Sequence, residues 1–161
     1  MIDVRTDDPA SPTAQQLLGE LSAALAAITG DSGQSSFALD DVRGPLARFV
    51  VARDADGAAL GCGALRPMAP SDAGDGPDAR VGEIKRMYAR PGTRGVGSAI
   101  LAKLEAEATT LGYGALRLST RAVNARAVAF YAQRGYRRID NFGRYAGRVE
   151  SVCFEKRLAV R

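Results

Sequence analysis

The sequence predicts an α/β (α+β) fold in which helices flank a mixed central sheet. Segments whose apolar residues recur at helical spacing alternate with shorter segments of strand-like alternation, a pattern typical of this class. Pro and Gly residues separate these segments at turns and helix ends. With 161 residues, of which 46% are hydrophobic and 25% charged, the chain can bury one core, so residues 1–161 are expected to form a single domain.

The first half of the chain predicts helices followed by a β-hairpin. Leucines at helical spacing run from Leu17 to Leu25, and Gly30 ends the pattern. An Asp-Gly pair ending at Gly57 separates two strand-like runs, which is a common hairpin signal. The expected elements are a helix at 12–29, a short helix at 39–46, strands at 48–52 and 58–65, and a surface loop at 67–80.

The second half predicts a strand that leads through a glycine turn into a helix. The central strand breaks at Pro91, and the chain passes Gly95 and Gly97 before the helix. The first N–H groups of such a helix have no partners within it and lie at the positive end of its dipole, which suits a phosphate. The expected elements are strands at 81–89, 115–120, 136–139 and 151–158, a helix ending at Gly112, and a helix from Asn124 to about Arg134.

Composition excludes several kinds of site. The chain has no histidine, which excludes Ser-His and Cys-His nucleophilic machinery and most zinc sites, and no metal is expected. Cys62 and Cys153 lie in strand-like apolar segments and are expected to be buried free thiols. No apolar run reaches the roughly 20 residues of a membrane span. The acidic start of the chain does not resemble a secretion signal, so a cytoplasmic protein without membrane contact is expected.

Charge is unevenly distributed along the chain. Residues 1–80 contain 6 Lys and Arg against 12 Asp and Glu, whereas residues 117–161 contain 11 against 3. Two interpretations stay open: solvated faces, or a polyanion that docks on the second half while a cationic group approaches the first. The basic half has neither a clustered Lys/Arg run nor interleaved aromatic residues, so no nucleic-acid partner is expected.

Two motifs in the second half carry the chemistry. They are E-I-K-R-M-Y-A-R-P followed by R-G-V-G-S-A-I-L, and then N-A-R-A-V-A-F-Y-A-Q-R-G-Y, and together they extend from Glu83 to about Tyr136. This combination resembles the acetyl-CoA-binding core of the Gcn5-related N-acetyltransferase (GNAT) superfamily. The resemblance implies the GNAT fold, with a mixed, mostly antiparallel central sheet and acetyl-CoA in the splay between two central strands. It also implies an N-acetyltransferase in which an amine attacks acetyl-CoA, the co-substrate, directly in a ternary complex.

The same resemblance implies which residues bind acetyl-CoA. The backbone N–H groups of the glycine turn would hold the pyrophosphate, and the backbone of Met87, Tyr88 and Ala89 would pair with the pantetheine arm like an added strand. The turn residues are Arg94, Gly95, Val96, Gly97, Ser98 and Ala99, and Asn124 and Tyr131 share one face of the later helix. Two registers of the turn stay open. In one, the run from Arg94 to Ala99 satisfies the letters of the family pattern. The preferred one aligns the following helix, which places Gly95 and Gly97 at the two family glycine positions and leaves Gly92 where the family has Arg or Gln.

Tyr131 and Glu83 are the expected catalytic residues. By resemblance, Tyr131 lies near the CoA sulfur as general acid, and a phenol with a pKa of about 10 stays protonated at neutral pH. Glu83 resembles the strand glutamate that acts as base, directly or through water, and this role requires burial or a relay. Strand alternation places Glu83 on the same face as Lys85 and Met87. The alternatives are a core role for Tyr131 beside Phe130 and an ion pair of Glu83 with Lys85 or an arginine.

Other parts of the chemistry stay open. Glu150, Asp40 and Asp41 are weaker candidates for the base, and solvent water alone is a further one. Tyr145 either contacts the acceptor or is a surface tyrosine. The acceptor is a small amine, amino acid, antibiotic, polyamine or protein N-terminus, and the acidic first half weakly favours a cationic one. Dimers are common among similar proteins, so a homodimer is compatible with the resemblance.

Two other functions compete with acetyl transfer. A non-catalytic acyl-CoA-binding sensor or partner domain of the same fold is the main alternative, and the presence of both Glu83 and Tyr131 argues against it. A dinucleotide-binding unit is disfavoured because Ile100 occupies the third glycine position of G-x-G-x-x-G. Neither cysteine lies in an activating setting, so a covalent acyl-enzyme is not expected.

Overall fold

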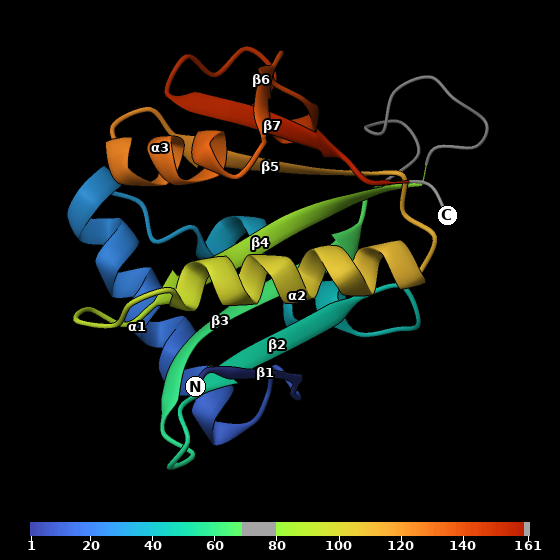
Figure 1. Cartoon of the computed structure of the whole chain (residues 1–161). Coiled ribbons are helices and arrows are strands. Elements are labelled where there is room, and N and C mark those ends of the chain that lie inside the picture. The colour runs from blue at the N-terminus through green and yellow to red at the C-terminus, as the bar shows by residue number, and fades with distance from the viewer. Residues whose placement is uncertain (69–79, 160–161) are drawn as a thin grey trace.

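Seven strands form one sheet in the computed structural model, which describes residues 1–68 and 80–159 (Figure 1). The strands are β1 (Asp3–Thr6), β2 (Arg48–Arg53), β3 (Ala59–Pro67), β4 (Val81–Ala89), β5 (Ala115–Arg121), β6 (Arg137–Ile139) and β7 (Ser151–Arg157). The helices are α1 (Pro12–Thr29), α2 (Val96–Thr110) and α3 (Ala125–Gln133). Three short 3-10 turns are η1 (Gln34–Ser36), η2 (Leu39–Val42) and η3 (Gly143–Tyr145).

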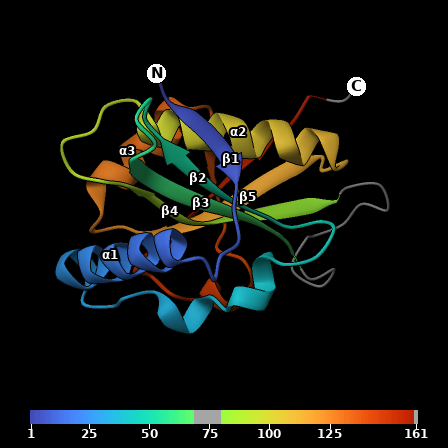
Figure 2. The same cartoon turned by 90° about the horizontal axis from the view of Figure 1, so that it is seen from below.

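The sheet has the strand order β1-β2-β3-β4-β5-β7-β6. β4 and β5 are parallel and are joined through α2, whereas all other neighbouring strands are antiparallel. The predicted mixed, mostly antiparallel sheet is therefore confirmed. α1 covers one face of the sheet, and α2 and α3 cover the other (Figure 2). None of the helices within the described ranges has the length and hydropathy needed to cross a membrane.

The ends of α1 and α3 follow their sequence signals. Ser11 Oγ accepts a hydrogen bond from the N–H of Ala14 (3.1 Å) at the start of α1, and Gly30, with a φ of 81°, ends this helix. Asn124 Oδ1 accepts from the N–H of Ala127 (3.3 Å) at the start of α3. The predicted helix at 12–29 and the predicted cap at Asn124 are confirmed.

Two elements differ from the prediction. β1 is absent from it, because this four-residue edge strand has three exposed residues and no apolar alternation. The helix expected at 39–46 is only the 3-10 turn η2, because Gly44 and Pro45 follow it and proline does not continue a helix. Residues 69–79, most of the expected surface loop, lie outside the described residues.

α2 packs closely on the middle of the sheet. Ile100, Leu101 and Leu104 are fully buried against it at helical spacing. Gly63 of β3 allows the close approach, because a Cβ atom there would lie 2.6 Å from Cγ2 of Ile100. This packing fixes the position of α2, and therefore of the glycine turn that begins it.

β4 and β5 separate after a short paired stretch. They pair at three positions, Val81 with Ala115, Gly82 with Leu116, and Glu83 with Arg117. Beyond Glu83 the two strands diverge, which Figure 1 shows as a gap that widens toward α3 and α1. The predicted splay between two central strands is confirmed.

A β-bulge at Arg86 changes the face that β4 presents. Arg86 has a φ of 54°, in the left-handed region, and the register with β3 shifts so that one residue of β3 lies opposite two of β4. Glu83 and Lys85 therefore face the side of α1 and the loop after it, whereas Met87 packs against the core under α2. The expectation that Met87 shares the face of Glu83 and Lys85 is wrong, because simple alternation stops at the bulge.

Candidate active site

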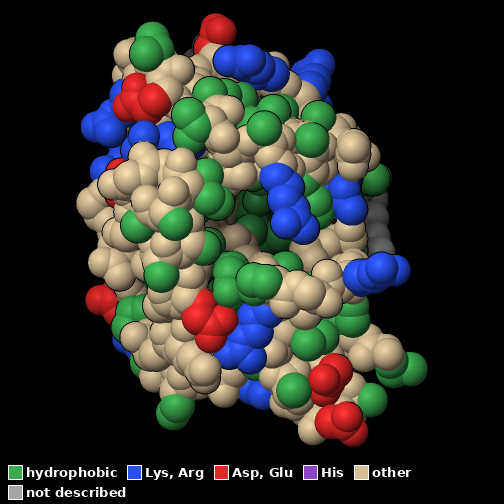
Figure 3. All heavy atoms as spheres, turned by 90° about the vertical axis from the view of Figure 1, so that its left-hand side faces the viewer, with side chains coloured by type: hydrophobic (Ala, Val, Ile, Leu, Met, Phe, Trp, Pro, Cys, Tyr) green, Lys and Arg blue, Asp and Glu red, His purple; other side chains and the backbone are tan. Residues whose placement is uncertain are grey.

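A cavity of about 200 Å³ opens where β4 and β5 separate. Its walls come from the later halves of both strands, the last turns of α1, the start of α3 and the loops around η1 and η3. Figure 3 looks at this end of the molecule and shows a hollow with hydrophobic side chains at its floor and Lys and Arg side chains at its rim. The separation of the strands thus creates the concave site expected for a small ligand.

The cavity brings predicted site residues together from two distant segments of the chain. Glu83 and Met87 come from β4, and Asn124 and Tyr131 come from the start and the body of α3. Tyr145 of η3 lines the same cavity. The remaining predicted residues lie outside its lining: Tyr88, Ala89, Arg94, Gly95, Val96, Gly97, Ser98 and Ala99.

Glu83 is buried and forms an ion pair. The residue is 2% exposed, and Arg66, its partner on β3, donates to Oε1 from Nε (2.9 Å) and from Nη2 (2.7 Å). Asp41 lies 3.5 Å from Nη1 of the same arginine. Glu83 therefore has both features that were expected from the sequence: the burial that a base requires, and the ion pair with an arginine that was the alternative role. Because Arg66 engages Oε1, the other oxygen, Oε2, remains for other partners.

Oε2 of Glu83 begins a row of polar groups on the cavity wall. The hydroxyl of Tyr145 donates to Oε2 (3.4 Å) and accepts from Nζ of Lys85 (3.4 Å), and both hydrogen bonds are long. Burial and the nearby Glu83 charge raise the pKa of Tyr145 to about 12. Burial lowers the pKa of Lys85 to about 8, although Glu83 opposes this shift. A carboxylate, a phenol and an amine thus adjoin one another beside the splay.

Tyr131 combines a core position with a hydroxyl that is free for a ligand. The residue is 7% exposed, and its ring contacts Phe130, Tyr136 and Phe154 with centroid distances of 5.1, 5.8 and 6.4 Å. Within the described ranges, no group forms a hydrogen bond with its hydroxyl, although the residue lines the cavity. Burial alone raises the pKa of Tyr131, so the phenol stays protonated.

The first turn of α2 carries N–H groups without a side-chain cap. Gly95 is the N-cap, with a φ of 71°, and no side chain accepts a hydrogen bond there. Gly97, in the first turn, lies against the ring of Phe130, since a Cβ at this position would be 3.2 Å from Cζ of that ring. A helix start of this kind is a general site for anions such as phosphate.

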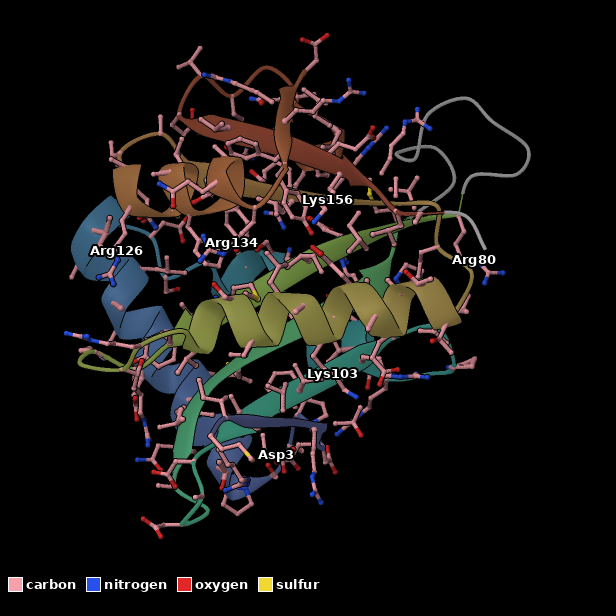
Figure 4. The ribbon with its side chains drawn as sticks, viewed as in Figure 1. Asp3, Arg80, Lys103, Arg126, Arg134 and Lys156 are labelled. Atoms are coloured by element: carbon pink, nitrogen blue, oxygen red, sulfur yellow. The ribbon has the colours of Figure 1, made fainter. Side chains whose placement is uncertain are left out.

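Arg134 at the end of α3 places a positive charge beside this turn, and sequence reasoning missed it. Its Nε donates to Ser98 Oγ (2.8 Å), Nη2 donates to the same oxygen, and the guanidinium lies 4.0 Å from the centroid of the Phe130 ring. Figure 4 shows Arg134 and Lys156 in the region between α3 and α2, where Lys156 Nζ donates to the Arg134 carbonyl (3.0 Å). The pairing of Arg134 with Ser98 depends on the tertiary packing of two helices, so no local pattern predicts it.

Two further cations of the cavity, Lys85 and Arg86, were also missed as site residues. Both are 8% exposed, and both line the cavity. Strict alternation would place one on each face of β4, but the bulge turns both toward the side of α1. The available signal was two adjacent cations in an otherwise apolar strand.

The other candidate groups fit less well. Asp40 and Glu150 are exposed and lie outside the cavity lining, and Asp41 is paired with Arg66. Cys62 and Cys153 are free and buried, as predicted. Burial raises the pKa of Cys62 to about 12 and also raises that of Cys153, so neither thiol is activated as a nucleophile.

Comparisons with known proteins agree with the fold. The sequence matches the Acetyltransferase (GNAT) family over residues 18–136. An IAA acetyltransferase of Azospirillum brasilense is 31% identical over 159 residues, with 98% of each chain covered. A structure assigned as an acyl-CoA N-acyltransferase from Klebsiella pneumoniae subsp. pneumoniae has 27% identity and a TM-score of 0.79, with 99% of each chain covered. A GNAT family acetyltransferase from Elizabethkingia anophelis with acetyl-CoA bound has 14% identity and a TM-score of 0.68, with 98% of each chain covered.

The chain therefore belongs to the GNAT family of acetyltransferases. The family match and the Azospirillum relative carry this assignment, and the Elizabethkingia structure adds the shared fold. The resemblance seen in the sequence is confirmed, and the protein is an acyltransferase of the N-acetyltransferase class.

Proposed function

We propose that the protein transfers the acetyl group of acetyl-CoA to an amine by direct attack within a ternary complex. The observation that carries this proposal is the cavity at the splay, where the free hydroxyl of Tyr131 and the buried carboxylate of Glu83 line one space. When bound, acetyl-CoA supplies an acetyl thioester whose carbonyl carbon the amine attacks, with release of the CoA thiol.

The donor side of the site fits acetyl-CoA in two ways. The glycine turn and the uncapped first turn of α2, residues Arg94 to Ser98, offer backbone N–H donors to a pyrophosphate, and Arg134 adds a positive charge beside them. The N–H of Ala99, the last residue of the predicted turn, already donates to the Gly95 carbonyl (3.0 Å). The later half of β4, with Met87, Tyr88 and Ala89, pairs with β3 on one edge only, because its pairing with β5 ends at Glu83. An edge without a strand partner can pair with the amide groups of an extended arm. Asn124 lines the same cavity.

Tyr131 acts as the general acid in this proposal. Its phenol lines the cavity and stays protonated, so it can donate to a departing thiolate. Its ring is held by Phe130, Tyr136 and Phe154, which fixes the direction in which the hydroxyl points. The absence of a protein partner for the hydroxyl, within the described ranges, leaves this proton for the ligand.

Glu83 acts as the general base, through a water or through Tyr145. An amine acceptor is mostly protonated at neutral pH and must lose a proton before or during attack. Arg66 orients the carboxylate through Oε1, which leaves Oε2 toward the cavity and the Tyr145 hydroxyl. The two buried thiols are not activated, which supports direct transfer over a covalent acyl-enzyme.

The experiment is a titration with acetyl-CoA by calorimetry, followed by a thiol-release assay with a panel of amines. The expected result is saturable binding of acetyl-CoA and thiol release that depends on an amine, with the acetylated amine detected by mass spectrometry. Binding of acetyl-CoA without thiol release for any amine would favour the acyl-CoA sensor instead. The absence of binding would refute both.

A further inference from the structure

Three cationic side chains of the cavity converge on the backbone of one loop, residues 31–37 after α1. Each donates to a different carbonyl oxygen of the loop: Arg86 Nη1 to Ser32 (3.2 Å), Arg144 Nη1 to Ser35 (3.1 Å) and Lys85 Nζ to Ser36. All three side chains line the cavity. A carbonyl oxygen satisfies a hydrogen bond but carries no net charge, so these contacts themselves supply no counter-charge to the three cations.

The carboxylates of the cavity are already paired with other cations. Glu83 is held by Arg66, and Asp31 accepts from Nη2 of Arg121 at 3.0 Å. Neither pairing involves Lys85, Arg86 or Arg144, and none of these three forms an ion pair with a carboxylate in residues 1–68 and 80–159. Arg148, a further cation of the lining, has no such partner there either. The cavity therefore carries an excess of positive charge.

Arg86 shows most clearly that a counter-charge is missing. The residue is 8% exposed, and its Nη2 donates to Ser22 Oγ (2.6 Å) and to the Leu18 carbonyl (3.3 Å). Its buried Nε has no hydrogen-bond partner within the described ranges. Burial of a guanidinium without a carboxylate costs free energy, and an anionic group of a ligand would offset that cost.

Little of the acidic character of the first half of the chain reaches this cavity. Among the acidic side chains of residues 1–68, only Asp31 lines the cavity, and it is paired with Arg121. The others lie outside the lining: Asp3, Asp7, Asp8, Glu20, Asp40, Asp41, Asp54 and Asp56. The weak expectation of a cationic acceptor came from the acidic composition of residues 1–80. The charges that line the cavity do not support it.

We propose that the acceptor is an amine that also carries a carboxylate, an amino acid in the simplest case, and that Lys85, Arg86 and Arg144 bind this carboxylate. The proposal rests on the proposed function, because it specifies the acceptor of the same cavity. Charge-assisted hydrogen bonds to a carboxylate are the strongest contacts that these side chains can make. Glu83 lies on the same face of β4 as Lys85, so a carboxylate held by the cations would place the neighbouring amine near the base.

The test separates recognition of the carboxylate from turnover. The complex of the protein with CoA is titrated by calorimetry with N-acetyl amino acids and with the matching N-acetyl amino amides, which differ only in the charge of that group. In parallel, thiol release from acetyl-CoA is measured with the free amino acids and the amino amides. The variants are Arg144→Gln, which removes an exposed cavity cation, and Arg138→Gln, an exposed arginine of β6 outside the cavity, as a control for net charge.

The expected result is that the acids bind about 10-fold or more tightly than the amides. Arg144→Gln should lose most of this preference and keep its affinity for CoA, whereas Arg138→Gln should keep both. Equal or weaker binding of the acids, or no binding of either set, would overturn the proposal. Selective binding of the acids without thiol release would contradict the proposed acetyl transfer and support the recognition of a carboxylate. Thiol release with amides as fast as with acids would contradict the recognition of a carboxylate and support the proposed acetyl transfer.

Discussion

Arg66 and Glu83 face each other across β3 and β4, and two nitrogens of the guanidinium donate to a single carboxylate oxygen, Oε1. The geometry orients the carboxylate without using its second oxygen. We therefore predict that Glu83→Gln, which keeps the shape of the side chain but not its basicity, lowers kcat by about 100-fold or more. The affinity for acetyl-CoA, measured by calorimetry, should not change. Glu150→Gln is the matched control, because Glu150 is exposed and outside the cavity. Full activity of Glu83→Gln would remove Glu83 as the base.

The two neighbouring tyrosines Tyr131 and Tyr136 should respond differently to loss of their hydroxyls. Tyr131→Phe is expected to lower kcat by about 100-fold, with little effect on stability, because its hydroxyl has no partner within the described ranges. Tyr136→Phe loses a hydrogen bond to Glu105 Oε2 (3.1 Å) and should cost about 1 kcal/mol of stability, with activity kept. Steady-state kinetics and urea unfolding check both. Equal kinetic effects in the two variants would contradict the assignment of Tyr131 as acid.

The depressed pKa of Lys85 predicts a pH-dependent contribution to stability. Burial lowers this pKa from 10.5 to about 8 in the folded chain, so the unfolded chain binds the proton more tightly. The charged amine therefore destabilises the fold below pH 8, and this cost disappears as the pH rises toward 10.5. Between pH 7 and pH 10 the wild type should gain about 2 kcal/mol of unfolding free energy relative to Lys85→Met. Urea unfolding of both proteins at the two pH values measures the difference, and a constant difference would show that Lys85 titrates normally.

Gly97 should control the affinity for acetyl-CoA. In Gly97→Ala the new Cβ would lie 3.2 Å from Cζ of Phe130, so the helix start and α3 must shift by a few tenths of an ångström. We expect the Kd for acetyl-CoA to rise about 10-fold, since contacts to phosphate depend on close approach of the backbone. Calorimetry measures this Kd. An unchanged Kd would show that the pyrophosphate binds away from the first turn of α2.

Two other glycines should give opposite changes in stability. A Cβ at Gly61 of β3 would lie 2.2 Å from the carbonyl oxygen of Tyr88, a backbone atom that cannot move freely, so Gly61→Ala should cost about 3 kcal/mol or more. Gly19 lies inside α1 with nothing within 4 Å of such a Cβ, so Gly19→Ala should stabilise the protein by roughly 0.5–1 kcal/mol. Thermal unfolding checks both. Gly19→Ala also serves as a glycine control for Gly97→Ala, because it should leave the Kd for acetyl-CoA unchanged.

Local signals predicted most of the fold. The cap residues Ser11 and Asn124 and the terminating Gly30 act within one helical turn, so their effects can be read from neighbouring residues. β1 carries no such signal, because it is held by its pairing with β2 and not by burial of its own side chains. The splay of β4 and β5 was expected only through the family resemblance, since no local pattern shows where two parallel strands stop pairing.

The site was predicted less completely than the fold. The family resemblance predicted four site residues that line one cavity: Glu83, Met87, Asn124 and Tyr131. The cations around loop 31–37 were not expected, because they come from β4 and from the loop before β7 and meet only in the folded chain. The bulge was also missed, since a left-handed conformation at an arginine has no signature in the neighbouring residues.

In the proposed ternary complex, the bulge at Arg86 divides β4 into two parts with different roles. Before the bulge, the side chains at positions 83 and 85 would serve the acceptor. After it, the strand turns its Met87 side chain toward the core under α2 and would leave its unpaired edge to the donor. Substitutions in β4 before the bulge can therefore alter which acceptor binds without changing the binding of the acetyl-CoA donor. Such a division allows one scaffold to acquire new acceptors through changes of a few side chains, without rebuilding the half that holds the common acetyl carrier.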